Sequence, residues 1–237
     1  MIVVGTTLAA FVMDQEDTWA SWMRNAEAVK AHHPDTQYFA AIEVDARGLA
    51  TFGPFIDRLK AIGGEYWTYS LDDGRTEVTT ANRLRHLCFG ENLCVDYAMS
   101  AQASHLLFMA ADCMPPDDVM PRMLEMEHPV CAPYITTYGL RGPKVKTNQT
   151  QTILYPKDWA VEAAMPSAAC IFIVRDVFRK IRWRWDFIDG SDDPCYYKDC
   201  TELLGVQPHV RHDVLAKHYP EAIGAIETRG HDMKVHR

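Results

Sequence analysis

The chain lacks the long apolar segments that would place it in a membrane. Among its 237 residues no run of about 18 apolar residues occurs, and the N-terminus has neither a basic region nor a small-residue cleavage site. We therefore expect neither a membrane span nor a signal peptide, and a cytoplasmic location. Disorder is excluded as well, because 48% of the residues are hydrophobic, which is enough for a sizeable core.

Three motifs that would indicate a bound metal, cofactor or triphosphate are also missing. The seven cysteines form no CxxC pair and no Cys/His spacing of a zinc site, so buried reduced thiols are expected. No GxGxxG follows an expected strand, which disfavours a dehydrogenase. The segment from Thr6 to Phe11 has no glycine and no basic residue. This disfavours a nucleotidyltransferase, which holds a triphosphate in a Gly-rich loop after its first strand.

An excess of positive charge is lacking too. The formal net charge is -8, which argues against a wholly basic surface for binding nucleic acid. Two local basic clusters nevertheless stand out, and each is either a solvated loop or helix face or a local phosphate-binding patch. They consist of Arg141, Lys144 and Lys146, and of Arg175, Arg179, Lys180, Arg182 and Arg184.

The hydrophobic pattern predicts alternating strands and helices. Strands are expected at 2–8, 38–44, 66–71, 105–112, 130–135 and 168–174, and helices behind Asp17 and over 52–62, 80–101 and 192–204. Repeated βα units predict an α/β fold with a mainly parallel central sheet and helices on both faces. No linker divides the chain, so we expect a single domain. The alternating Trp183 and Trp185 indicate a half-buried strand, with an acceptor platform as the alternative.

The most informative stretch is 105–118, where an apolar run ends at Asp112 and Pro115-Pro116 then mark a helix start. In an open α/β sheet, ligands bind outside the carboxyl ends of the strands. An acid at that position is suited to holding a metal or a polar ligand. Asp112 is therefore the first candidate functional residue.

The order of these segments resembles the GT-A class of nucleotide-sugar glycosyltransferases over most of the chain. The Asp-x-Asp motif of that class has Ala110 in place of its first acid here, so that Asp112 alone remains. The resemblance implies one GT-A-like domain in which 1–112 binds the nucleotide sugar and 113–237 supplies the acceptor and catalytic half. The matching residues, in chain order, are Arg83, Arg85, Gly90-Glu91-Asn92, Phe108 to Asp112, Pro115-Pro116, Ser167 to Arg175, Gly190-Ser191-Asp192-Asp193, Gly205, Asp213 and His218.

The resemblance also implies roles for single residues. Asp112 and His218 would hold Mn²⁺ or Mg²⁺, which neutralises charge on a departing nucleoside diphosphate. Asp193 would be the catalytic base and Asp192 an acceptor-binding acid, although the reverse assignment and a helix-capping role stay open. Donor contacts would come from Thr6, Thr7, Leu8, Asp45, Arg83, Ala110, Ala111 and Asp112.

The implied activity is transfer of a hexose from a nucleotide diphosphate sugar, with a UDP-sugar favoured, to an acceptor hydroxyl. Compact enzymes of this class occur in bacteriophages, where some glycosylate hydroxymethylated DNA bases. DNA is thus one acceptor hypothesis, in the host cytoplasm if the protein is phage-encoded, with contacts from Lys144, Lys146, Arg179, Arg182 and Arg184. The alternatives are a small-molecule, glycan or protein hydroxyl, or a degenerate module that only binds a sugar nucleotide.

Overall fold

The structure is a computed structural model, which describes residues 1–8, 16–44, 49–71, 80–111, 113–136, 150–152, 169–186 and 192–218. Its strands are β1 (Ile2–Leu8), β2 (Gln37–Glu43), β3 (Glu65–Tyr69), β4 (His105–Met109), β5 (Cys113–Met114), β6 (Val130–Thr136), β7 (Thr150–Thr152), β8 (Cys170–Val174) and β9 (His209–His218). Its helices are α1 (Glu16–His32), α2 (Gly53–Ala61), α3 (Thr80–Ser100), α4 (Val119–Leu124), α5 (Arg175–Phe178) and α6 (Asp192–Leu204), and a 3-10 turn, η1 (Leu49–Phe52), precedes α2.

The described strands form one sheet in the order β3-β2-β1-β4-β8-β6-β9-β5, with β7 paired to β9. The first four strands in this order are parallel, as expected from their βα connections. Strand β8 then runs antiparallel to both β4 and β6, so the second half of the sheet is mixed. The predicted α/β sheet is thereby confirmed, and its parallel part is the half in which βα units repeat.

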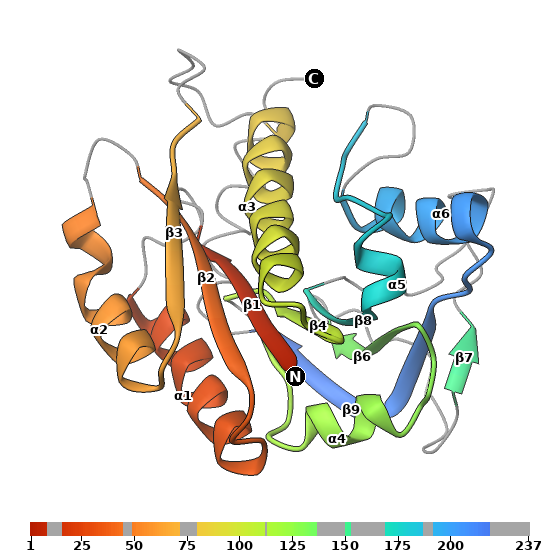
Figure 1. The fold of residues 1–237 in the computed structure, drawn as a ribbon, viewed down its shortest axis with the longest axis horizontal. Helices are drawn as coiled ribbons and strands as arrows, with labels where there is room; N and C mark the ends of the chain where they lie inside the picture. Colours follow the sequence, from red (N-terminus) through yellow and green to blue (C-terminus); the bar gives the residue numbers. More distant parts are fainter. Residues whose placement is uncertain are drawn as a thin grey trace.

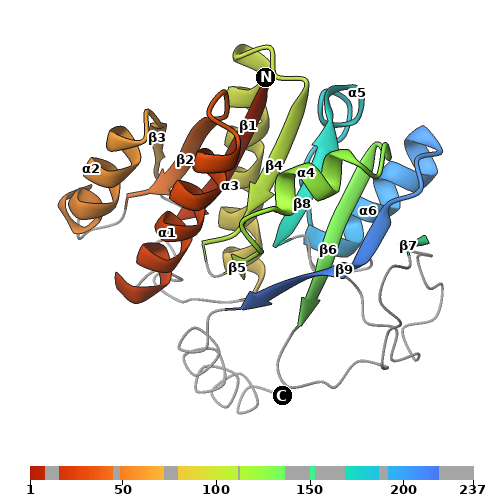
Figure 2. The ribbon, with the colours of Figure 1, turned by 90° about the horizontal axis from the view of Figure 1, so that it is seen from below.

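Two apolar cores lie on opposite faces of this sheet. One contains side chains of α1, α2 and α4, including Trp22 and Phe55, and the other contains side chains of α3, α5 and α6, including Tyr196. Figure 1 shows the long helix α3 lying across the sheet, and Figure 2 shows α1 and α4 on the side opposite to it. Strands covered on both faces need apolar residues at nearly every position, which explains the unbroken apolar runs of β2 and β4.

Strand β9 crosses the end of the sheet and was not predicted from the sequence. It pairs with β6 over most of its length and then reaches β5, a course visible in Figure 2. Its register against β6 shifts between Pro133 and Tyr134, and its buried Val210 and Val214 are separated by arginine, histidine and aspartate. The irregular register removes the period-two pattern that would have revealed the strand.

Several local predictions can be checked against the described residues. The bounds of α6 agree with the predicted 192–204, and Gly205 ends the helix with φ of +65°, a conformation that glycine adopts without strain. All seven cysteines are buried and none forms a disulfide, as expected. The predicted strand around Trp183 and Trp185 is wrong, because 181–186 is an irregular segment. None of the described helices is both long and apolar enough to cross a bilayer.

Candidate active site

The carboxyl ends of the four parallel strands share one edge of the sheet. At this edge the predicted donor residues Thr6, Thr7 and Leu8 end β1, and all three side chains are buried. The Thr7 hydroxyl oxygen lies 3.5 Å from the hydroxyl oxygen of Tyr69, which donates a hydrogen bond of 3.1 Å to the carbonyl of His86. A buried polar network therefore joins the ends of β1 and β3 to α3.

A second polar contact joins the end of β2 to α3. Glu43, the last residue of β2, is 5% exposed and pairs through its carboxylate with Nδ1 of His86. The sequence prediction chose Asp45, which lies outside the described residues, and assigned no role to either member of this pair. The sequence did contain a signal for Glu43, because a charged residue at the end of an apolar strand requires a partner once it is buried.

The end of β4 is held from both sides. The carbonyl of Met109 accepts a 3.1 Å hydrogen bond from Nε1 of Trp22, and the amide of Ala110 donates to the carbonyl of Ala169 at 2.6 Å. The amide of Cys113 donates to the carbonyl of Ala110 at 3.0 Å. Asp112 is itself outside the described residues, but both of its neighbours in the chain, Ala111 and Cys113, are buried.

The pairing of β5 with β9 bears on the predicted metal ligands. Cys113 is the register partner of His218, the last residue of β9. Because Asp112 immediately precedes Cys113 in the chain, the backbone of His218 lies opposite the residue next to Asp112. The two predicted ligands are 106 positions apart in sequence. His218 ends β9, whereas Asp112 and the side chain of His218 lie outside the described residues.

Asp192 and Asp193 begin α6, and both side chains are half-buried. Their neighbour across the helix interface is Glu91 of α3, whose carboxyl group shares a hydrogen bond with that of Asp192. Burial raises the pKa of Glu91 well above its usual value, and the two aspartates raise it further. Negative charge in the first turn is also favoured by the helix dipole, so the position suits either a capping or a catalytic role.

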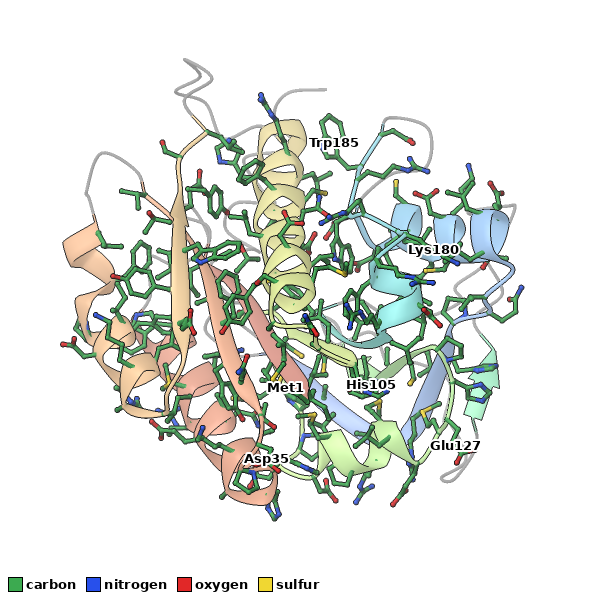
Figure 3. The ribbon with its side chains drawn as sticks, in the orientation of Figure 1. Met1, Asp35, His105, Glu127, Lys180 and Trp185 are labelled. Atoms are coloured by element: carbon green, nitrogen blue, oxygen red, sulfur yellow. The ribbon has the colours of Figure 1, made fainter. Side chains whose placement is uncertain are left out.

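Helices α3 and α6 are fastened together through the segment between β8 and α6. The side chain of Asn92 bonds both backbone groups of Trp183, with Nδ2 donating to the carbonyl at 2.9 Å and Oδ1 accepting from the amide at 3.0 Å. The Trp183 ring stacks on Tyr196 of α6 with ring centroids 4.1 Å apart. Trp185 of the same segment packs against the apolar core to which α3 and α6 contribute (Figure 3). The start of α6 therefore has a fixed position relative to α3.

Three of the basic residues proposed to contact DNA have acidic partners. Arg182 lies 2.6 Å from Asp96, Arg184 lies 2.7 Å from Asp199, and Arg179 lies 3.1 Å from Asp176. Their positive charge is largely offset, so this cluster attracts phosphate less than the sequence suggests. Lys144 and Lys146 lie outside the described residues. Arg83 falls near the start of α3, and its side chain is likewise outside the description.

No family model and no curated protein sequence matches the chain. Solved structures do share its fold. The mannosyltransferase PcManGT from Pyrobaculum calidifontis, in complex with GDP-Man and Mn²⁺, aligns with a TM-score of 0.57 at 8% identity, over 92% of this chain and 56% of that one. The fold is GT-A-like.

Two further structures show the range of proteins that share this fold. S. aureus TarS aligns with a TM-score of 0.54 at 10% identity, over 92% of this chain and 37% of that one. A nucleoside-diphosphate-sugar pyrophosphorylase from Vibrio cholerae RC9 aligns with a TM-score of 0.55 at 12% identity, over 95% and 98% of the two chains. The chain thus spans only about a third to a half of TarS and PcManGT. The TM-scores establish the shared fold. Sequence identities this low do not establish the reaction, which has to be argued from the residues of the site.

Within this GT-A-like fold, Gly90 sets the distance between α3 and the edge where β1 and β3 end. A Cβ atom at this position would lie 2.1 Å from Oγ1 of Thr7 and 2.9 Å from the hydroxyl oxygen of Tyr69. We expect Gly90→Ala to lower the free energy of unfolding by about 2 kcal/mol, because overpacking outweighs the better helix propensity of alanine.

Urea unfolding at pH 7 measures the effect of Gly90→Ala, and Gly53→Ala is the matched control. Gly53 is also helical, but a Cβ atom there would meet no atom within 4 Å, so its substitution should change stability by less than about 0.5 kcal/mol. Equal effects of the two substitutions would show that α3 does not depend on close approach at Gly90.

Proposed function

We propose that the protein is a metal-dependent glycosyltransferase that moves a hexose from a nucleotide diphosphate sugar, with UDP-sugars as the favoured donors, to an acceptor hydroxyl. The observation that carries this proposal is the pairing of Cys113 with His218 at the end of the sheet. It brings a histidine beside the segment that contains Asp112, at the edge where ligands bind in open α/β folds. PcManGT, which shares the fold, holds a sugar nucleotide and Mn²⁺.

The proposed metal ligands are Asp112 and His218. One carboxylate and one imidazole form a donor set that suits Mn²⁺, since imidazole is a better ligand for Mn²⁺ than for Mg²⁺. A bound divalent cation would supply charge neutralisation for the diphosphate leaving group. The side chain of Ala110 has no ligating atom. Asp112 is therefore proposed to supply alone the carboxylate contacts to the metal that two acids share in the full Asp-x-Asp motif.

The residues proposed to contact the donor are Thr6, Thr7, Leu8, Asp45, Arg83, Ala110, Ala111 and Asp112. The Thr7 side chain interacts with the Tyr69 hydroxyl and lies close to Gly90, so its proposed role is to shape the floor of the site and to position α3. The proposal assigns residues 1–112 to donor binding and residues 113–237 to the acceptor and catalytic half.

In the proposed reaction the acceptor oxygen attacks the anomeric carbon, and the bond between that carbon and the diphosphate oxygen breaks. The electron pair of the broken bond leaves with the nucleoside diphosphate. The acceptor's proton passes to Asp193, which then releases it to solvent. Asp193 is half-buried at the start of α6, where the helix dipole favours its ionised form.

Duplex DNA with hydroxymethylated bases is the acceptor hypothesis that the sequence resemblance favours. The salt bridges of Arg179, Arg182 and Arg184 and the net charge of -8 limit the affinity it can have. A salt titration of DNA binding separates this hypothesis from a small-molecule, glycan or protein acceptor. Contacts to phosphate make affinity fall steeply with salt, and a flat response would reject DNA.

The likeness to a pyrophosphorylase makes nucleotidyl transfer the competing hypothesis. The chain lacks glycine and basic residues from Thr6 to Phe11, where a triphosphate would be held. A screen for thermal shifts with UDP-sugars, GDP-sugars and nucleoside triphosphates, each with and without Mn²⁺, tests both. A ligand that binds only the native state raises its stability, by about 2.7 kcal/mol at 100 times Kd.

We expect a shift with at least one sugar nucleotide that is larger in Mn²⁺. A shift with triphosphates alone would favour nucleotidyl transfer. The absence of a shift with every compound would reject a donor site, and a shift without any transfer would indicate a degenerate binding module.

A further inference from the structure

Glu91 is an acid in an unusual position. Its side chain is 4% exposed in the middle of α3, and glutamate is rarely buried to this degree without a cationic partner. The charged groups of the described residues that act on it are Asp192 and Asp193, both acids. No salt bridge within the described residues therefore accounts for its burial.

The contact between Glu91 and Asp192 requires a proton. Two ionised carboxylates can only accept hydrogen bonds, so a hydrogen bond between two carboxyl groups needs one of them to be protonated. Glu91 is the more deeply buried of the two, and burial is the largest cause of its raised pKa. The raised pKa of Glu91 favours its protonated form, in which it can donate to the carboxylate of Asp192. The other carboxyl oxygen of Glu91, Oε2, has no hydrogen-bond partner among the described residues.

The neighbours of Glu91 in the chain hold this contact in place. Gly90 allows α3 to approach Thr7 and Tyr69 at the donor edge, and Asn92 binds the backbone of Trp183, which stacks on α6. The three consecutive residues thus join the end of β1 to the start of α6. Glu91 sits between the two attachments and faces the catalytic candidates.

We propose that Glu91 is a positioning residue for the aspartate pair, sharing a proton with Asp192 and thereby leaving Asp193 as the carboxylate that accepts the acceptor's proton. The inference rests on the proposed function, and it resolves which of the two aspartates is the base. Asp192, already engaged by Glu91, fixes the first turn of α6. Asp193 is then presented to the site by a helix end that is locked against α3.

The shared proton predicts a pH dependence of stability. Glu91 has a folded-state pKa above its usual value of 4.5, so folding holds a proton that the unfolded chain releases. Stability is therefore lost as pH rises above about 4.5, by up to tenfold in the folding equilibrium constant per pH unit, until the folded-state pKa is reached. The ionisable groups that interact with Glu91 are Asp192, Asp193 and Tyr196 of α6, Tyr69 of β3, and Cys88 and Cys94 of α3.

Urea unfolding of wild type and Glu91→Gln between pH 5 and pH 8 tests the proton without any activity assay. Glutamine keeps a donor to Asp192 but cannot ionise, so the loss of stability with rising pH should be smaller in the variant. Glu202→Gln, at an exposed acid on α6, should follow wild type. Parallel curves for wild type and Glu91→Gln would overturn the inference. If Glu91→Gln does not fold, carboxyl ¹³C titration of the wild type decides, because one glutamate should titrate after all others.

Kinetics of donor turnover test the positioning role. We expect Glu91→Ala to lower kcat by about 100-fold with the donor KM within about threefold, because the misplaced aspartate pair acts in the transition state. Glu91→Gln should recover most of the lost kcat, since its amide can donate to Asp192. If Glu91→Ala kept the turnover of wild type, or if both variants were equally slow, the positioning role of Glu91 would be overturned while the proposed function would stand. Absence of turnover in wild type would overturn the proposed function, and with it the catalytic purpose of Glu91.

Discussion

Replacement of Asp193 by asparagine is expected to lower kcat for sugar transfer by about 10³-fold while leaving donor binding nearly intact. The acceptor hydroxyl has a pKa far above neutrality and must lose its proton as it attacks. Asparagine is close in shape to aspartate but cannot take that proton. Because Asp193 belongs to the acceptor half of the proposed site, the thermal shift given by the donor should remain.

Two matched variants make the result of Asp193→Asn specific. Asp192→Asn should lose less activity, because its hydrogen bond with Glu91 can be kept by the amide oxygen. Glu202→Gln removes an exposed acid from the same helix and should leave kcat within about twofold of wild type. Full turnover in Asp193→Asn would instead mean that Asp193 serves the helix end, a role in which asparagine is an adequate substitute.

The parallel half of the fold was predictable because its signals are local. The strands β2 and β4 contain continuous apolar runs and β1 begins with one, while the helices show helical patterning, so their bounds agree with expectation within a few residues. Strand β9 was missed because its burial is set by pairing with β6 across an irregular register. Such pairing depends on residues about 80 positions away, which a local pattern does not contain.

The residues of the candidate site likewise fall into those that local sequence identifies and those whose roles depend on contacts between distant segments. Asp192 and Asp193 were chosen through the resemblance to the GT-A class, and their place at a helix start beside Pro194 left a capping role open. The resemblance included Gly90, Glu91 and Asn92 as a pattern but gave them no physical role. Their roles appear only when α3 is packed against β1 and α6, where Gly90 faces Thr7, Glu91 faces Asp192 and Asn92 holds Trp183. The separate roles of these three consecutive residues therefore depend on contacts with segments that are distant in the sequence.

Buried acids show why the functional residues were only partly identified. Glu43 and Glu91 are both almost fully buried, one paired with His86 and the other hydrogen-bonded to Asp192. In the sequence Glu43 is marked only by its place at the end of an apolar strand, and Glu91 is an ordinary helical glutamate, because burial of a side chain is a property of the folded state. The acids chosen from the sequence were those that follow strands or begin helices. That criterion finds Asp112 and Asp193, but it cannot find an acid in the middle of a helix.

Substitution of Asp112 by asparagine is expected to remove the Mn²⁺-dependent part of donor binding. The amide keeps the size of the side chain but has no negative charge, and Ala110 offers no second acid to replace it. With donor at 100 times the wild-type Kd, the wild type gains about 2.7 kcal/mol of stability, and a variant that binds 100-fold more weakly gains about 0.4 kcal/mol. Thermal unfolding with donor, with and without Mn²⁺, measures this difference.

Asp117→Asn is the matched control for Asp112→Asn, because Asp117 is an exposed acid only five positions further along the chain. It should keep the full Mn²⁺-dependent shift. His218→Gln should resemble Asp112→Asn, since His218 is the register partner of Cys113, the residue that follows Asp112 in the chain. If Asp112→Asn kept the shift while His218→Gln lost it, the metal would be held without the carboxylate. Loss in both variants, with Asp117→Asn unaffected, would mean that a single acid and a histidine suffice where related motifs use two acids.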